Sequence, residues 1–332
     1  MRPGVLPTLA AIVPGGLLHG AGTYVAGDKR TAKRLVIAGS AGFAALLLAG
    51  GMLELTGTSR RLVGVFVPLA FVGSAVFFTS WLADLYGAAT GGREATAASF
   101  TPWAEWEAGY RYVYDPQFAY RSFAALRSDL RHGALRVSPT AMIALDDDNQ
   151  RLGLDLAYRL RGRRPGEHSL DGSFLDVTSG LLLHRYGAEG FAVWTPTFAL
   201  EGRLDLAHVG KSLRGAFVDG QLGAGLELYA FEGRGQAREN AFGLLLARFG
   251  FGVYFGSGAT RTGELSVYYD HRHDDFAAGL GVRGIASGVV GHIGGAGHYY
   301  FDRHWGASAL LEVGSAVVSG VSVRYRAGGS ER

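Results

Sequence analysis

The sequence contains no cysteine. This absence excludes disulfide bonds, thiolate metal sites and cysteine nucleophiles, and it is common in bacterial envelope proteins. The chain also lacks a phosphate-binding loop, a dinucleotide-binding fingerprint and a zinc-hydrolase motif, so no cofactor is expected. The formal net charge is only +3, with +4 in residues 1–100 and −1 in the rest. The C-terminal part therefore lacks the basic excess that a nucleic-acid partner requires.

Glycine, in contrast, is abundant. It accounts for 52 of the 332 residues, more than twice the average share of about 7%. The glycines follow no collagen period and are not collected in one linker. Glycine spread through alternating segments is typical of barrels, where strands bend sharply and side chains that face a crowded interior must be small.

Residues 151–162 show most clearly how the C-terminal part is built, because apolar and polar residues alternate through them. One face consists of Leu152, Leu154, Leu156, Tyr158 and Leu160. The other consists of Arg151, Gly153, Asp155, Ala157, Arg159 and Arg161. A period of two predicts a β-strand, and a stretch of about ten residues is long enough to cross a bilayer as a tilted strand.

This alternation has two interpretations. In a soluble sandwich the apolar face points into a core, whereas in a membrane barrel it faces lipid and the polar face lines a lumen. The N-terminal part of the chain favours the membrane. Residues 35–53 and 62–82 are uncharged runs of 19 and 21 residues, and each matches the roughly 20 residues that a helix needs to cross the hydrocarbon. They predict a transmembrane helical hairpin.

Before this hairpin, residues 5–27 are apolar but interrupted by Pro14 and two glycines, which indicates an interfacial or re-entrant segment. The stretch PGGLLHGAGTYVAGDKRTAKRLVI, residues 14–37, resembles the opening of small two-helix bacterial membrane modules. His19 belongs to this stretch and is expected to be a structural, hydrogen-bonded residue. The composition then predicts three parts: a helical membrane segment at 1–86, a linker at 87–101 and a β-barrel at 102–328.

The barrel is expected to contain about twelve antiparallel strands connected up and down, because closure removes exposed strand edges. The first strand, near residues 103–115, places Trp106 and Tyr110 on one face and Glu107 and Arg111 on the other. Residues 118–131 fit either a strand or an amphipathic helix. The remaining predicted strands cover 135–145, 151–161, 175–186, 191–206, 221–231, 242–254, 263–270, 276–285, 289–300, 305–313 and 317–326.

A membrane barrel of this kind should line its lumen with charges of both signs in the middle of its strands. The lumen-lining candidates are Arg151, Asp155, Arg159, Arg161, Glu201, Arg203, Asp205, Glu227, Glu264 and Arg283. At this level the chain resembles bacterial outer-membrane β-barrels, a likeness that implies an outer-membrane location and a lipid environment. It departs from that class because the sequence RAGGSER follows Tyr325, where an aromatic end of the last strand is usual.

Several polar clusters contain residue types that can bind a metal ion or act as a nucleophile. His271, His273 and Asp275 have ligand types that suit a divalent ion, although they fall where a hairpin should turn and a solvated charged loop is the simpler interpretation. A looser set combines His292, His298 and His304 with Asp302. The barrel serines Ser266, Ser287 and Ser308 have no neighbours that mark a serine nucleophile.

The preferred hypothesis is therefore a non-enzymatic envelope protein whose barrel forms a narrow pore or a closed scaffold. Its helical hairpin would anchor it or bind other envelope proteins. Two alternatives remain open from the sequence: a barrel enzyme that modifies lipids, and an inner-membrane hairpin that carries a soluble ligand- or protein-binding β domain.

Overall fold

The computed structural model describes residues 4–57, 60–92, 97–98, 100–116, 121–231, 241–257, 261–278, 280–281 and 289–328. The chain forms two compact units. The first unit consists of Met1–Thr96, Leu204–Asp219 and Phe249–Tyr254. The second unit consists of Ala97–Arg203, Gly220–Arg248 and Phe255–Arg332. Two short stretches of the strand region therefore group with the N-terminal helices, a division that chain order does not reveal.

Four helices make up the N-terminal region: α1 (Val5–Ile12), α2 (Ala21–Val25), α3 (Lys29–Leu55) and α4 (Arg60–Thr90). Both α3 and α4 are long and apolar enough to cross a membrane, which confirms the two predicted apolar helices. They are longer than the uncharged runs because their ends include flanking charged and polar residues. Asp28 caps α3, since its carboxylate accepts the Thr31 backbone N–H at 3.0 Å.

Small residues let α3 and α4 approach closely. A Cβ atom at Gly42 would lie 2.7 Å from the Phe77 nitrogen, and one at Gly73 would lie 2.8 Å from the Leu46 nitrogen. Both distances are too short for any side chain, so the helix backbones touch at these glycines.

Residues 206–215 connect β6 (Phe191–Asp205) to β7 (Ala216–Phe231), and they belong to the first unit, which we call the helical unit. The short 3₁₀ helices η1 (Leu206–His208) and η2 (Lys211–Leu213) lie in this connection. Leu213 is fully buried in a cluster with Leu35 of α3 and Tyr86 of α4. The Tyr86 hydroxyl donates to the Arg214 carbonyl at 2.7 Å. This connection is thus held to the helices by both apolar packing and hydrogen bonding.

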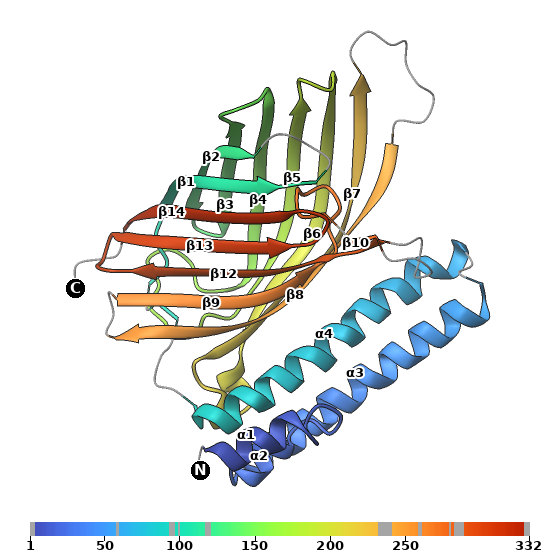
Figure 1. Cartoon of the computed structure of the whole chain (residues 1–332). Coiled ribbons are helices and arrows are strands. Elements are labelled where there is room, and N and C mark those ends of the chain that lie inside the picture. Colours follow the sequence, from blue (N-terminus) through green and yellow to red (C-terminus); the bar gives the residue numbers. More distant parts are fainter. Residues whose placement is uncertain are drawn as a thin grey trace. The chain divides into compact units, whose positions relative to one another are not determined.

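A closed antiparallel barrel of twelve strands follows the helices, in confirmation of the predicted fold class (Figure 1). Its strands are β1 (Ala104–Tyr114), β2 (Ser122–His132), β3 (Leu135–Ala144), β4 (Asn149–Gly162), β5 (Phe174–Tyr186), β6 (Phe191–Asp205), β7 (Ala216–Phe231), β8 (Ala241–Ser257), β9 (Arg261–Asp270), β12 (His292–Tyr300), β13 (Trp305–Val313) and β14 (Val317–Ala327). Strands β1 and β14 pair along their whole length and close the ring, with Trp106 opposite Tyr325.

The strand number agrees with the prediction through two compensating differences. The ambiguous residues 118–131 contain a barrel strand, β2, rather than a helix. The predicted barrel strand at 276–285 is wrong at its start, because residues 271–278 form a loop, and residues 282–285 lie outside the described residues. After this loop, β10 (Leu280–Gly281) pairs with β11 (Val289–Val290) in a separate two-stranded sheet. The apolar residues Phe276 and Ala277 misled the prediction here, because they are buried against side chains of the barrel strands while they belong to a loop.

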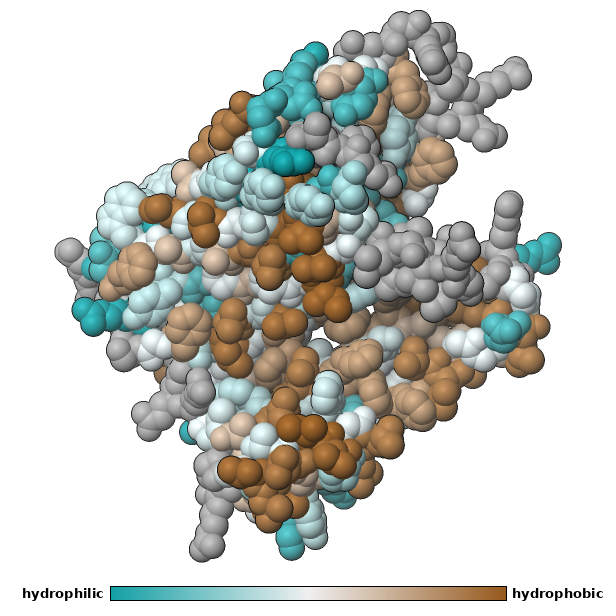
Figure 2. Space-filling view, in the orientation of Figure 1, coloured by the Kyte–Doolittle hydropathy of each residue, from teal (hydrophilic) through white to brown (hydrophobic). Residues whose placement is uncertain are grey.

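The outer face of the barrel wall is apolar. On β4, the side chains of Leu152, Leu154, Leu156, Tyr158 and Leu160 are between 42% and 50% exposed. Figure 2 shows hydrophobic side chains over the visible wall of the barrel and along the helices. These exposed apolar side chains form the surface that would meet hydrocarbon in a membrane.

Candidate functional site

The candidate site is the barrel interior, where the strands place their polar side chains. Arg151, Asp155 and Arg159 lie on the face of β4 opposite its leucines. Interior glycines leave room for these long side chains. A Cβ atom at Gly153 would lie 2.4 Å from the Thr140 hydroxyl, and one at Gly180 would lie 2.4 Å from the Asp155 carboxylate. The interior is therefore packed as well as charged.

Ion pairs line the interior near the end of the barrel where β1 begins. The Arg159 guanidinium binds both carboxylate oxygens of Asp176, at 2.7 and 2.9 Å. Arg136 of β3 reaches Glu201 of β6 at 3.1 Å. The first pair joins the adjacent strands β4 and β5 and holds its two side chains in a defined geometry, whereas the second joins the non-adjacent strands β3 and β6.

The same level of the barrel contains two further acidic centres. Arg203 of β6 binds Glu264 of β9 at 2.9 Å. Glu105 of β1 is paired with both Arg324 and Arg131. We call this set of ion pairs the charge belt, and its members are Glu105, Arg131, Arg136, Arg159, Asp176, Glu201, Arg203, Glu264 and Arg324. The belt combines both signs of charge, so it suits water and small polar solutes of either sign.

A cavity of ≈ 270 Å³ lies beside the charge belt and is partly covered at this end of the barrel. Arg163 donates to the Ala98 carbonyl at 2.5 Å and to the Thr101 hydroxyl at 2.8 Å. The Arg326 guanidinium lies 4.7 Å from the centre of the Phe100 ring. The segment that precedes β1 is thus held against the barrel interior by two arginines.

A second cavity of ≈ 330 Å³ lies further along the interior. Its charged lining consists of Arg111, Arg127, Arg151, Asp155, Arg272, Asp275 and Glu312. Its uncharged lining includes threonine hydroxyls and the side chains of Met142 and Leu310. This cavity is large enough for several waters or one small solute.

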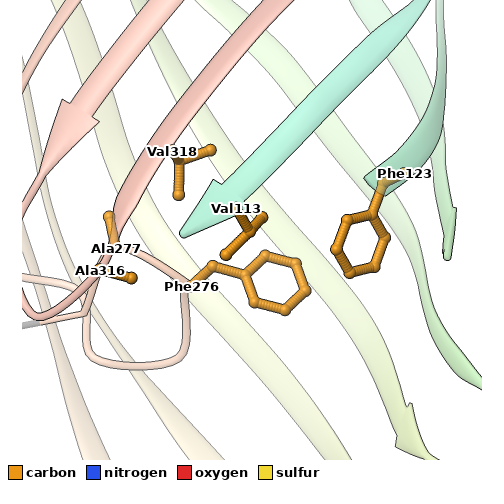
Figure 3. Close-up of a cluster of buried hydrophobic side chains, with 6 residues drawn as sticks. All are labelled: Val113, Phe123, Phe276, Ala277, Ala316 and Val318. Atoms are coloured by element: carbon orange, nitrogen blue, oxygen red, sulfur yellow. The ribbon is translucent and has the colours of Figure 1, made fainter. Parts of the chain in front are cut away.

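The loop at residues 271–278 folds inward at the other end of the barrel, and we call it the inward loop. Figure 3 shows Phe276 pointing between Val113 and Phe123, which belong to β1 and β2. The rings of Phe276 and Phe123 are 5.0 Å apart. Ala277 packs into the same buried cluster with Ala316 and Val318. The inward loop therefore has its own apolar anchor inside the barrel and narrows the lumen there.

Charged residues anchor the inward loop as well. Asp275 binds Arg151 of β4 at 2.5 Å, and Arg272 binds Asp274 at 2.7 Å within the loop. Burial acts to raise the pKa of Asp275, but Arg151 and Arg272 outweigh it and hold that pKa well below its usual range. Asp275 is consequently ionised at neutral pH, and the ion pair with Arg151 persists.

The histidines of the inward loop lie close together. The rings of His271 and His273 are 4.7 Å apart, and the Tyr269 hydroxyl is 3.1 Å from His271 Nδ1. Burial, together with a smaller contribution from the nearby His273, lowers the pKa of His271 to about 4. Within the part of the chain that the structure describes, no three His, Asp or Glu side chains form a group that could hold a metal ion. The carboxylate of Asp275 is directed to Arg151 instead.

The remaining lumen candidates occupy different positions. Glu227 alternates with the exposed Leu226 and Leu228 on β7, on the opposite face. Asp205 is buried and accepts a hydrogen bond from the Tyr254 hydroxyl at 2.5 Å, within the helical unit. Arg161 follows a bulge in β4, and its register partner on β5 is the outward-facing Leu175. It therefore does not lie on the polar face, where simple alternation had placed it. Arg283 lies outside the described residues.

Several interior charges were not among the predicted candidates. Glu105 and Arg111 lie on the polar face of the first predicted strand, so the same alternation could have identified them. Arg127 and Asp129 belong to β2, whose residues fit two interpretations. Arg127 and Asp129 form an ion pair at 3.2 Å, and this pair could be predicted only if residues 118–131 were first assigned to a strand.

The other polar candidates do not assemble into one centre. His298 is in the interior beside the charge belt, whereas His304 Nδ1 is 3.0 Å from the Arg326 carbonyl. Ser308 donates to Glu107 at 3.0 Å and Ser266 to the Ala296 carbonyl at 3.4 Å. Ser287 is not among the described residues. In the helical unit, His19 is buried with its Nδ1 2.6 Å from the Ser80 hydroxyl, in agreement with a structural role.

No protein-family model matches the sequence, and no curated protein matches it. Solved structures with a similar arrangement include the KdgM porin in complex with disordered oligogalacturonate, at 11% identity and a TM-score of 0.38, covering 67% of this chain and 98% of that one. The outer membrane protein Omp33 of Acinetobacter baumannii is similar at 9% identity and a TM-score of 0.33, covering 69% and 99%.

The translocator domain of autotransporter NalP from Neisseria meningitidis is similar at 15% identity and a TM-score of 0.35, covering 68% of this chain and 88% of that one. The low identities and TM-scores give these similarities no weight in assigning a function to this chain.

Proposed function

We propose that this protein spans the outer membrane of a bacterial envelope and that its barrel provides a narrow, mixed-charge path for small hydrophilic solutes. The observation that carries this proposal is the inverted distribution of side chains. The outer wall is apolar and solvent-accessible, whereas the interior contains ion pairs and two cavities. A soluble barrel would have the opposite distribution, because its dry core would exclude these charges.

The backbone supports the same proposal. Hydrocarbon offers no hydrogen-bond partners, so a membrane-spanning sheet must close on itself and leave no free edge. The pairing of β1 with β14 achieves this closure. An even number of antiparallel strands, twelve here, is also usual for bacterial outer-membrane barrels.

The proposed path is narrow because side chains and a loop occupy parts of the barrel interior. The charge belt joins non-adjacent strands at one level, and the inward loop packs against β1 and β2 at another. Water and small ions fit the cavities between these obstacles, whereas folded polypeptides do not. A closed scaffold is the second candidate function. It is favoured because both the charge belt and the inward loop narrow the interior.

The helical hairpin has a proposed role of its own. The apolar surfaces of α3 and α4 are long enough to span hydrocarbon. We expect this hairpin to contact membrane lipid and to anchor the protein or bind another envelope protein.

Reconstitution of the full chain into planar lipid bilayers tests the pore. We expect discrete but small conductance steps in potassium chloride. The variant Phe276→Ala removes the ring that anchors the inward loop and should increase the single-channel conductance. The matched control is Phe198→Ala, which removes an aromatic ring that is 61% exposed on β6 and should leave the conductance unchanged. A folded protein that gives no conductance, with or without Phe276, would reject the pore and leave the closed scaffold.

A further inference from the structure

Among the described residues that line the larger interior cavity, one charged side chain of each sign forms no hydrogen bond or ion pair. Arg111 of β1 forms no hydrogen bond or ion pair with a described side chain, and its Nε atom is buried without a partner. Asp155 of β4 also forms no hydrogen bond or ion pair with a described residue, although its carboxylate faces the cavity. A buried donor without a partner is costly, so a ligand or water that accepts from Arg111 is strongly favoured.

The other charges that line this cavity are already engaged. Arg127 is paired with Asp129 at 3.2 Å, and Arg272 is paired with Asp274 at 2.7 Å. Arg151 and Asp275 are paired with each other at 2.5 Å. Glu312 accepts a hydrogen bond from the Tyr268 hydroxyl at 2.6 Å. Pairing therefore leaves Arg111 as the available cation and Asp155 as the available anion.

The rest of the lining restricts the size and polarity of a ligand. The cavity volume of ≈ 330 Å³ is at the lower end of the range for small-molecule sites, about 300–1,000 Å³. Met142 and Leu310 provide apolar contact surface beside the two charges. A suitable ligand is small, carries both a negative and a positive group, and has an apolar portion.

We propose that this cavity is a binding site for a small zwitterion of the α-amino-acid type, whose carboxylate binds Arg111 and whose ammonium group binds Asp155. This inference rests on the proposed pore function, since it names the class of solute that the path would take. An arginine guanidinium can bind a carboxylate through two parallel hydrogen bonds, and a carboxylate accepts readily from an ammonium group. The site thus recognises both charges of one molecule.

Three related probes separate the two contacts: leucine, N-acetyl-leucine, which lacks the ammonium charge, and leucine methyl ester, which lacks the carboxylate. Isothermal titration calorimetry on the full chain in detergent measures binding of each. We expect leucine to bind about 10-fold or more tightly than either derivative, since each lost contact is a charge-assisted hydrogen bond.

Two variants then assign the contacts. Arg111→Met should weaken leucine and N-acetyl-leucine by about 10-fold or more, with little effect on the methyl ester. Asp155→Asn should weaken leucine and the methyl ester and spare N-acetyl-leucine. Each variant should still bind one of the three probes normally. A variant that failed to fold would bind none of them, so misfolding would give a different result. Arg161→Met, which removes an arginine outside the cavity, is the control and should bind leucine as the natural protein does.

Equal binding of all three probes, no binding of leucine, or an equal loss in Arg161→Met would overturn the zwitterion site. Potassium chloride conductance separates this outcome from failure of the proposed function. Conductance without leucine binding would retain the pore and reject the site. Leucine binding without conductance would retain the site within a closed barrel.

Discussion

At the scale of single residues, the buried carboxylate of Asp84 shows how one side chain organises the N-terminal segment. Asp84 is fully buried in α4, and it accepts the backbone N–H groups of Gly22 and Thr23 at 3.0 and 2.8 Å. These N–H groups belong to the first turn of α2, where a helix leaves donors without intrahelical partners. Asp84 supplies those partners from a position more than sixty residues further along the chain.

Asp84→Ala is expected to destabilise the helical unit by about 2–5 kcal/mol, because two buried donors would lose their acceptor. Urea unfolding in detergent, followed by helical circular dichroism, measures this change. Glu54→Ala is the matched control, since Glu54 is an exposed carboxylate on α3 and its removal should change the stability by less than about 0.5 kcal/mol. Equal stabilities of the two variants would contradict the role assigned to Asp84.

Glycine acts at the same scale inside the barrel. A Cβ atom at Gly109 would lie 2.3 Å from the Ser322 hydroxyl, and one at Gly294 would lie 2.3 Å from the Tyr268 ring. These positions explain part of the glycine excess. Composition indicated a crowded interior, but it did not identify which neighbours fill each space.

At the scale of elements, the inward loop is the feature that separates an open barrel from a narrow one. Its apolar anchor is Phe276 and its ionic anchor is Asp275 with Arg151. His271 and His273 lie at its start, where burial lowers both pKa values below the ordinary value of 6.5. Asp274 and Asp270 oppose this shift at His273, whereas His292 adds to it. Packing of the inward loop inside the barrel, which we call docking, therefore favours the neutral form of both histidines.

The pH dependence of the loop follows from this direction. In a loop released from the barrel interior, His271 would have its ordinary pKa of 6.5, whereas in the docked loop its pKa is about 4. The neutral form therefore stabilises docking fully above pH 6.5, and this stabilisation is lost as the pH falls toward about 4. We expect single-channel conductance to increase when the pH is lowered from 7.5 to 5. Electrical recording of the reconstituted protein measures the change.

The double variant His271→Gln and His273→Gln removes both titrating groups and should show little change over the same pH range. A rise of equal size in this variant would assign the pH dependence to other residues. The Asp275–Arg151 pair should not contribute, because the pKa of Asp275 lies well below this range.

At the scale of the whole molecule, the outer wall should behave as a lipid-facing surface. Leu156 lies near the middle of β4 and is 48% exposed. Leu156→Arg is expected to destabilise the barrel in lipid vesicles by about 2–4 kcal/mol, the cost of a lipid-facing arginine near the bilayer midplane. Leu145→Arg is the control, because Leu145 is 65% exposed at a turn and should tolerate charge.

Urea titration of folding into vesicles compares the two variants. If Leu156→Arg folds in lipid as stably as Leu145→Arg, the outer wall does not face hydrocarbon. The soluble β domain would then become the better interpretation.

Local patterns predicted different parts of this architecture with different success. Strict alternation at 151–162 predicted both the strand β4 and its two faces, but the bulge between Arg159 and Arg161 reversed the last position. The segment containing β2 was ambiguous because its apolar spacing suits a helix as well. Residues 276–285 were predicted as a strand because they begin with apolar side chains. Phe276 and Ala277 are indeed buried, but they belong to the inward loop.

The sequence by itself determined that two apolar helices precede a series of alternating strands, because each depends on the spacing of neighbouring residues. Tertiary structure decided which charges meet. Arg136 and Glu201 are far apart in the chain, and Arg111 of β1 and Asp155 of β4 line one cavity although their strands are not adjacent. It also decided that the β6–β7 connection packs with α3 and α4. Contacts of this kind depend on strand register and closure, which no local pattern specifies.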